Sequence, residues 1–177
     1  MSAAVTVRRA TAADAATILG FVRALAAYER EPDAVVVTEA TLRAQLAADP
    51  PPFECLLAEE DGAPRAFALF FGTYSTWLGR PGIWLEDLFV PPEHRGRGIG
   101  ALLLREIARL AVARGCGRVE WSVLDWNEPA LGFYARLGAI AMDEWTTHRL
   151  TGDTLARLAA GAAPPPAPAA GGPTAPG

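Results

Sequence analysis

The chain has 177 residues, of which 51% are hydrophobic and 20% charged, the balance of one soluble globular domain. Its formal net charge of −4 argues against a nucleic-acid partner, because nucleic-acid binders usually carry a basic patch. The longest apolar runs are too short to cross a bilayer and the N-terminus lacks the features of a signal peptide. We therefore expect a cytoplasmic protein with no membrane partner. The two cysteines have no metal-ligand spacing, so we expect no metal.

The N-terminal part predicts a short strand, Val5–Arg8, followed by two helices. Thr11 and Asp14 resemble a capping box at the start of the first helix. Its apolar residues recur at helical spacing and predict one buried stripe: Ile18, Phe21, Val22 and Leu25. Thr38 is expected to cap a second helix that ends near Ala48, before three consecutive prolines.

The middle of the chain predicts a run of strands and one long amphipathic helix. The expected strands are 54–60, 66–74, 83–90 and 119–124, and the helix covers 98–114. Such a mixture predicts an α/β domain with a mixed, mostly antiparallel central sheet flanked by helices.

The C-terminal part predicts one more helix, capped by Asn127 and broken at Gly138, and then two short strands at 139–142 and 146–150. After Arg157 the sequence has no charge and consists almost entirely of Ala, Pro and Gly. Such a segment buries too little apolar surface to offset its ordering entropy. We therefore expect a domain over 1–158 and a disordered tail over 159–177.

A glycine-rich loop joins the strand 83–90 to the helix 98–114. Its sequence, Arg95-Gly96-Arg97-Gly98-Ile99-Gly100-Ala101, allows close approach of a ligand to the backbone, and the helix start offers unpaired N–H groups to a phosphate. Neither the P-loop nor the dinucleotide pattern is present. From the loop alone, a phosphate site and a plain tight turn with two surface arginines remain equally open.

The strand 83–90 is apolar except for Glu86 and Asp87. A carboxylate in a buried strand costs several kcal/mol unless it is paired or lies in a wet cleft. Because side chains alternate along a strand, we expect the two carboxylates to point to opposite faces, so that one can serve chemistry while the other serves structure. For Asp87 alone we favour the structural role.

These segments resemble the GNAT acetyltransferase superfamily, and more closely its diamine acetyltransferases (spermidine/spermine acetyltransferases and their thialysine-acetylating relatives). The resemblance rests on the glycine-rich loop, on Trp84-Leu-Glu-Asp87, on Leu25-Ala-Ala-Tyr-Glu29, and on Asn127-Glu-Pro-Ala130 followed by Phe133-Tyr134. It runs from about residue 5 to about residue 158 and implies a single GNAT-type domain that uses acetyl-CoA and forms a homodimer.

The resemblance also implies roles for individual residues. Tyr134 would be the general acid, and Glu86 would be the base, acting through water. Tyr28 and Glu29 would line the site of a small-molecule amine together with Glu86. The cofactor would be held by Leu88, Phe89, Val90, Arg95, Gly96, Arg97, Gly98, Ile99, Gly100, Ala101 and Asn127.

The expected activity is direct transfer of acetyl from acetyl-CoA to a primary amine of a polyamine, a diamine or a thialysine-like molecule. Two alternatives stay open at this point. One is an acetyltransferase for another amine, such as an amino acid derivative, an antibiotic or a protein. The other is a non-catalytic CoA-binding regulatory domain.

Overall fold

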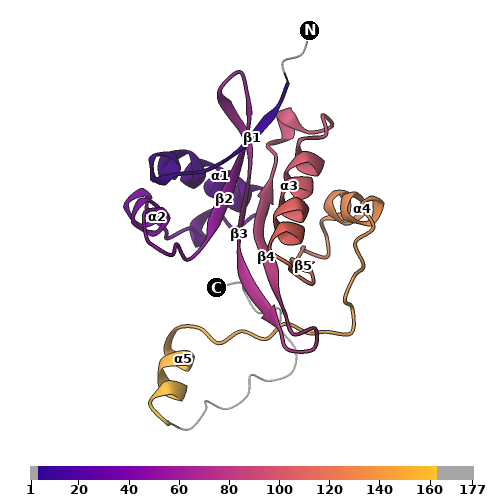
Figure 1. Cartoon of the computed structure of the whole chain (residues 1–177). Coiled ribbons are helices and arrows are strands. Elements are labelled where there is room, and N and C mark those ends of the chain that lie inside the picture. The colour runs from indigo at the N-terminus through magenta and orange to yellow at the C-terminus, as the bar shows by residue number, and fades with distance from the viewer. Residues whose placement is uncertain (1–3, 163–177) are drawn as a thin grey trace. The chain divides into compact units, whose positions relative to one another are not determined.

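A computed structural model describes residues 4–162 and divides the chain into two compact units, one ending at Val123 and the other beginning at Leu124. The first unit is an α/β fold on one five-stranded sheet with the order β1-β2-β3-β4-β5 (Figure 1). The strands are β1 (Thr6–Arg9), β2 (Glu54–Glu60), β3 (Ala63–Ser75), β4 (Arg80–Phe89) and β5 (Val119–Glu120). Strands β1 to β4 pair antiparallel and β5 pairs parallel to β4, which confirms the predicted mixed, mostly antiparallel sheet.

Three helices accompany this sheet: α1 (Ala15–Tyr28), α2 (Glu39–Leu46) and α3 (Ile99–Ala113). The predicted capping box is present. The Asp14 carboxylate accepts the backbone N–H of Thr11, and the Thr11 hydroxyl accepts a backbone N–H from the turn that follows it. The predicted cap of α2 is also present, because the Thr38 side chain accepts the N–H of Thr41. The capping box begins a 3-10 turn, Ala12–Asp14, that leads into α1, and of these two helix starts only that of α2 is capped directly by a side chain.

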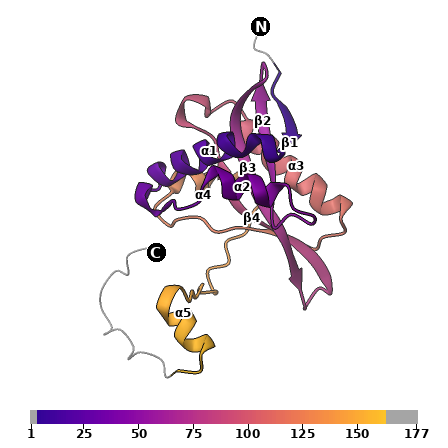
Figure 2. The same ribbon diagram turned by 90° about the vertical axis from the view of Figure 1, so that its left-hand side faces the viewer.

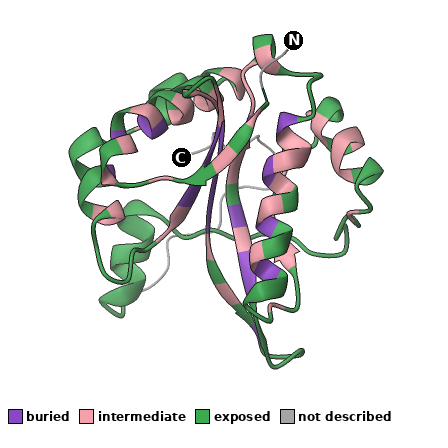
Figure 3. Cartoon of the chain, turned by 45° about the horizontal axis from the view of Figure 1, so that its top comes forward, coloured by how far each residue is buried: buried purple, intermediate pink, exposed green. Residues whose placement is uncertain are grey.

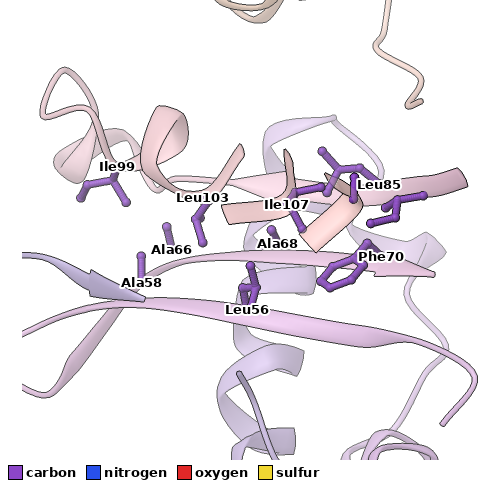
Figure 4. Close-up of a cluster of buried hydrophobic side chains, with 11 residues drawn as sticks. Leu56, Ala58, Ala66, Ala68, Phe70, Leu85, Ile99, Leu103 and Ile107 are labelled. Carbon is purple, nitrogen blue, oxygen red and sulfur yellow. The ribbon is translucent and has the colours of Figure 1, made fainter. Parts of the chain in front are cut away.

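The helices form a layer on each face of the sheet: α1 and α2 cover one face, and α3 covers the other (Figure 2). Strand β3 supplies both cores by alternation. Ala66, Ala68 and Phe70 pack against α3, whereas Phe67 and Leu69 pack toward α1 and α2. The buried residues lie on the strands and on the sheet-facing sides of the helices (Figure 3), and Figure 4 shows the core on the α3 side.

Strand β5 meets β4 over only two residue pairs, which involve Ile83 and Trp84. Gly82 permits this approach, because a Cβ there would lie 2.7 Å from the Thr73 hydroxyl and 3.4 Å from the carbonyl of Arg118. Beyond Trp84, strand β4 continues to pair with β3 as far as Phe89. Within the described sheet, one edge of the second half of β4 therefore has no strand partner.

The second unit contains α4 (Glu128–Arg136) and α5 (Gly152–Ala159). The predicted strands at 139–142 and 146–150 are wrong, since both segments lack strand pairing. A β-strand needs a neighbour for its backbone groups, and the residues of a segment alone do not provide one. The predicted strand 119–124 ends at Glu120 for the same reason. Apart from its first four residues, the expected tail over 159–177 lies outside the described residues.

Candidate active site

A β-bulge in β4 shapes the centre of the first unit. Leu85 pairs with Phe70 and Asp87 pairs with Leu69, so Glu86 is the extra residue between two consecutive partners on β3. The bulge changes which face the side chains of β4 occupy. Leu85 belongs to the core under α3, whereas Phe89, four residues later, belongs to the core under α1 and α2. Simple alternation would have put both on one face.

Both carboxylates of β4 consequently lie on the α1 face of the sheet. Asp87 is directly opposite Leu69, which packs toward α1, and cross-strand partners share a face. Glu86 accepts a hydrogen bond of 2.7 Å from the indole Nε1 of Trp84. The partner of Trp84 is Phe71, which follows Phe70 and so lies on the α1 face. The expectation that Glu86 and Asp87 point to opposite faces is therefore wrong.

The electrostatics of the two carboxylates differ. Glu86 is exposed at the surface, whereas Asp87 is partly buried. Burial, followed by the negative charges of Glu86 and Glu29, raises the pKa of Asp87 to about 7. Burial also raises the pKa of Glu29, the residue that ends α1. Three carboxyl groups thus share one region in which negative charge is disfavoured, and a cation would relieve it.

Tyr28, in the last turn of α1, belongs to an aromatic and cationic stack beside these carboxylates. Its ring lies 6.2 Å from the ring of Phe89, and the Arg95 guanidinium carbon lies 4.4 Å from the centre of the Tyr28 ring. The Arg95 Nε also donates a hydrogen bond of 2.9 Å to the carbonyl of Val90. The first arginine of the glycine-rich loop therefore contacts the α1 side of the fold, a contact that the sequence did not indicate.

The glycine-rich loop has the backbone conformation that its sequence predicts. Gly96 and Gly98 have φ values of 74° and 78°, in the left-handed region that favours glycine. Gly98 is the N-cap of α3, whose first N–H groups have no partner within the helix. A Cβ added at either glycine would meet no atom within 4 Å, so the space beside the loop is open. An open, donor-rich helix start fits the pyrophosphate of CoA.

The second loop arginine, Arg97, has a different partner. It forms an ion pair with Glu60 at the end of β2, and Arg65 lies 3.5 Å from the same carboxylate. The guanidinium of Arg97 lowers the pKa of Glu60. The sequence did not distinguish the two arginines, but their contacts differ: Arg95 contacts Tyr28 on α1, and Arg97 contacts Glu60 on β2.

An open cavity of about 710 Å³ adjoins this region of the first unit. It lies along the outer side of α1 and reaches Phe89 and the loop that precedes α3. Its lining is mostly apolar and includes Phe21, Tyr28, Phe89, Pro91 and Glu93. Small molecules from the solvent can therefore reach the Tyr28 end of α1 through this cavity.

The two predicted site residues of the second unit are Asn127 and Tyr134. Asn127 is the N-cap of α4 and accepts the N–H of Ala130 through its side chain, as predicted. Tyr134 lies in α4 with its ring 5.1 Å from that of Phe133. Burial raises the pKa of Tyr134 to about 12, so its phenol is protonated at neutral pH.

The first unit contains most of the predicted site residues: Tyr28, Glu29, Glu86, Leu88, Phe89, Val90, Arg95, Gly96, Arg97, Gly98, Ile99, Gly100 and Ala101. Sequence reasoning assigned Asp87 a structural role and did not indicate that it lies on the same face as Glu86. The available signal was its place beside Glu86 in an otherwise apolar strand, and the bulge that turns it to the same face has no local sequence signature. No cluster of three or more metal-ligating side chains occurs among residues 4–162, and none of the helices described there could span a membrane.

An open strand edge, a glycine-rich helix start and a group of carboxylates are the parts of an α/β enzyme that binds a phosphate-bearing co-substrate. Comparison with known proteins identifies the class further. The family model for the acetyltransferase (GNAT) family matches residues 22–139. The chain belongs to this family and is an N-acetyltransferase, which transfers an acetyl group to an amine; the family uses acetyl-CoA.

Individual relatives agree with this assignment. The chain is 39% identical over 168 residues to the thialysine N-epsilon-acetyltransferase of Sus scrofa, covering 89% of this chain and 98% of that protein. It is 45% identical over 95 residues to the L-ornithine N5-acetyltransferase of Arabidopsis thaliana, covering 54% of this chain and 42% of that protein. Among solved structures, an integron cassette protein from the mobile metagenome of V. cholerae superposes with a TM-score of 0.74 at 26% identity, covering 90% and 98% of the two chains.

Proposed function

We propose that this enzyme acetylates the primary amine of a small molecule that carries a second positive charge: a diamine, a polyamine or a thialysine-like diamino acid. The observation that carries the proposal is the group formed by Glu29, Glu86 and Asp87, whose charges interact unfavourably in the free protein. A dication entering this region would gain from all three carboxyl groups. The relatives named for thialysine and ornithine act, by those names, on side-chain amines of diamino acids, which supports the same class.

The residues of the loop are suited to hold the donor. We assign the pyrophosphate of acetyl-CoA to the backbone of 96–101 at the start of α3, and its pantetheine arm to the open edge of β4 at 88–90. Asn127 would contribute from α4. Acetyl-CoA would supply the acetyl group of its thioester, and CoA would leave as a thiol.

Glu86 is the proposed proton acceptor. An alkyl amine has a pKa of about 10.4, so only about one molecule in a thousand is an uncharged nucleophile at neutral pH. Glu86 is exposed and held by the indole of Trp84, so it can take a proton from the ammonium group, directly or through water. Asp87 and Glu29 would hold the positive charges of the substrate beside it.

Tyr134 is the proposed proton donor. A pKa of about 12 keeps its proton on Oη throughout the physiological range. CoA leaves as a thiolate whose conjugate acid has an unperturbed pKa of about 8.5, below that of Tyr134. The neutral phenol would therefore donate a hydrogen bond to the sulfur as negative charge develops there, and any proton it gave up would be replaced by the proton that the amine releases. No covalent enzyme intermediate is needed. We also expect, from the family resemblance alone, a cytoplasmic homodimer.

The test is an amine panel with acetyl-CoA, in which released thiol and the mass of the product are measured. Thialysine, ornithine and spermidine should show higher kcat/KM than monoamines of similar length. The preference should weaken with added salt, because exposed charges are screened over about 8 Å at physiological ionic strength. Glu29→Gln should reduce the preference, whereas Glu106→Gln, the same charge change on α3, should not. Equal efficiency on monoamines and diamines at low salt would refute the proposed substrate class.

A further inference from the structure

The stack of Arg95 on Tyr28 connects two sites that the family resemblance treats separately. Arg95 belongs to the loop that is assigned to the donor pyrophosphate, and Tyr28 belongs to the end of α1 that is assigned to the amine. The guanidinium carbon lies 4.4 Å from the Tyr28 ring centre and 5.9 Å from that of Phe89. Both distances are within the range of a cation–π interaction. One side chain thus contacts both halves of the active region.

The contacts of Arg95 are compatible with each other. A cation–π stack uses the face of the guanidinium plane, whereas its N–H groups donate within the plane. The Nε donates a hydrogen bond of 2.9 Å to the carbonyl of Val90, which holds Arg95 close to the end of β4. In-plane donors at the end of the same side chain can bind a phosphate without breaking the stack. Arg95 therefore does not have to leave Tyr28 when the donor binds.

The position of Tyr28 decides where the end of α1 lies. Glu29 follows it directly, and α1 then ends sharply because Arg30 takes a left-handed conformation with φ of 68°. The N–H of Glu31 donates back to Ala26 at 2.8 Å, so little freedom remains at this helix end. Holding the Tyr28 ring against Arg95 and Phe89 consequently holds Glu29 in the region where its charge raises the pKa of Asp87.

We propose that Arg95 is a positioning residue of the amine site, which acts through Tyr28, in addition to any contact it makes with the donor. This inference rests on the proposed function, because it assigns Tyr28 and Glu29 to the amine. It separates Arg95 from Arg97. Arg97 pairs instead with Glu60 at the end of β2, so it serves as a control in the same loop.

The experiment measures the KM values for acetyl-CoA and for the best amine separately in a set of variants. Arg95→Gln should raise the amine KM about three- to ten-fold, the size of a partly desolvated cation–π contact. The same substitution in the Tyr28→Leu background should leave the amine KM unchanged, because the stack is already lost. Arg97→Gln should raise only the acetyl-CoA KM in both backgrounds.

A conservative variant separates charge from stacking. Arg95→Lys keeps the positive charge but lacks the planar group and the Nε donor, so it should restore the acetyl-CoA KM and leave the amine KM raised. Urea unfolding of the Arg95→Gln, Tyr28→Leu and double variants gives a second readout that needs no substrate. The two substitutions should be non-additive, with a coupling of about three- to five-fold in the folded-to-unfolded ratio.

The outcomes are distinguishable from failure of the proposed substrate class. Equal activity on monoamines and diamines would refute that class and still allow the two KM values to be compared. An amine KM that does not respond to Arg95→Gln, or that responds equally in the Tyr28→Leu background, would overturn the positioning role. Full rescue of both KM values by Arg95→Lys would overturn it as well, because charge alone would then suffice.

Discussion

Replacing Asp87 with asparagine removes a carboxyl group that the folded chain holds in an unfavourable setting. Asparagine has nearly the same shape as a protonated aspartate and carries no charge at any pH. The pKa of Asp87 rises from an ordinary value of 3.8 to about 7, through burial first and then the charges of Glu86 and Glu29. Three pKa units at 1.36 kcal/mol each give at most about 4 kcal/mol of lost stability once the group is ionised.

The sign of the pH dependence follows from proton binding. Between pH 4 and pH 7 the folded state retains the proton of Asp87 and the unfolded state has released it, so the free energy of unfolding falls as pH rises. Above pH 7 both states are ionised and the loss is complete. Asp87→Asn should therefore match the wild type near pH 4 and exceed it at pH 8, by up to about 4 kcal/mol.

Urea unfolding followed by tryptophan fluorescence at pH 4.5, 6 and 8 would measure this difference. Asp33→Asn, at an exposed aspartate in the short turn after α1, is the control and should show no pH-dependent gain. A difference between Asp87→Asn and wild type that does not change with pH, or that favours the wild type at pH 8, would refute the electrostatic reasoning.

Two further substitutions address the donor loop and the proposed base. Gly98→Asp should abolish CoA binding in calorimetry, because it adds a carboxylate beside the pyrophosphate position. Gly98→Asn is the control: asparagine tolerates a φ of 78° and adds no charge, so this variant should retain part of the affinity for CoA. Equal CoA affinities for Gly98→Asp and wild type would contradict the assigned site. Glu86→Gln keeps an oxygen acceptor for Trp84 and should lower kcat at pH 7 by about two powers of ten. That deficit should shrink as pH rises, and a constant deficit would indicate substrate positioning in place of proton removal.

The features that the sequence predicted are those that depend on local chemistry. Thr11, Thr38 and Asn127 cap helices because their side chains reach backbone N–H groups two or three residues away. Gly96 and Gly98 take left-handed conformations within a single loop. The strand 54–60 was predicted with its observed limits, because both of its faces are filled by apolar residues between a proline stop and an Asp-Gly turn.

The features that the sequence did not predict depend on contacts between distant segments. Arg95 meets Tyr28 across 67 positions of the chain, and nothing beside either residue indicates the other. The segments 139–142 and 146–150 were predicted as short strands, but no neighbouring strand pairs with them in the described residues. A pairing partner decides whether such a segment becomes a strand.

The bulge at Glu86 shows the same dependence at the site itself, and it connects stability to function. Burial is the main cause of the raised pKa of Asp87, and the bulge adds to it by placing Asp87 on the face of Glu86 and Glu29, whose negative charges repel it. The same repulsion is what a cationic amine would relieve, because a nearby positive charge favours the ionised carboxyl group. Amine binding near pH 7 should therefore lower the pKa of Asp87 and release a proton from it. The stability lost at this position in the free enzyme is then recovered, in part, as affinity for a charged substrate.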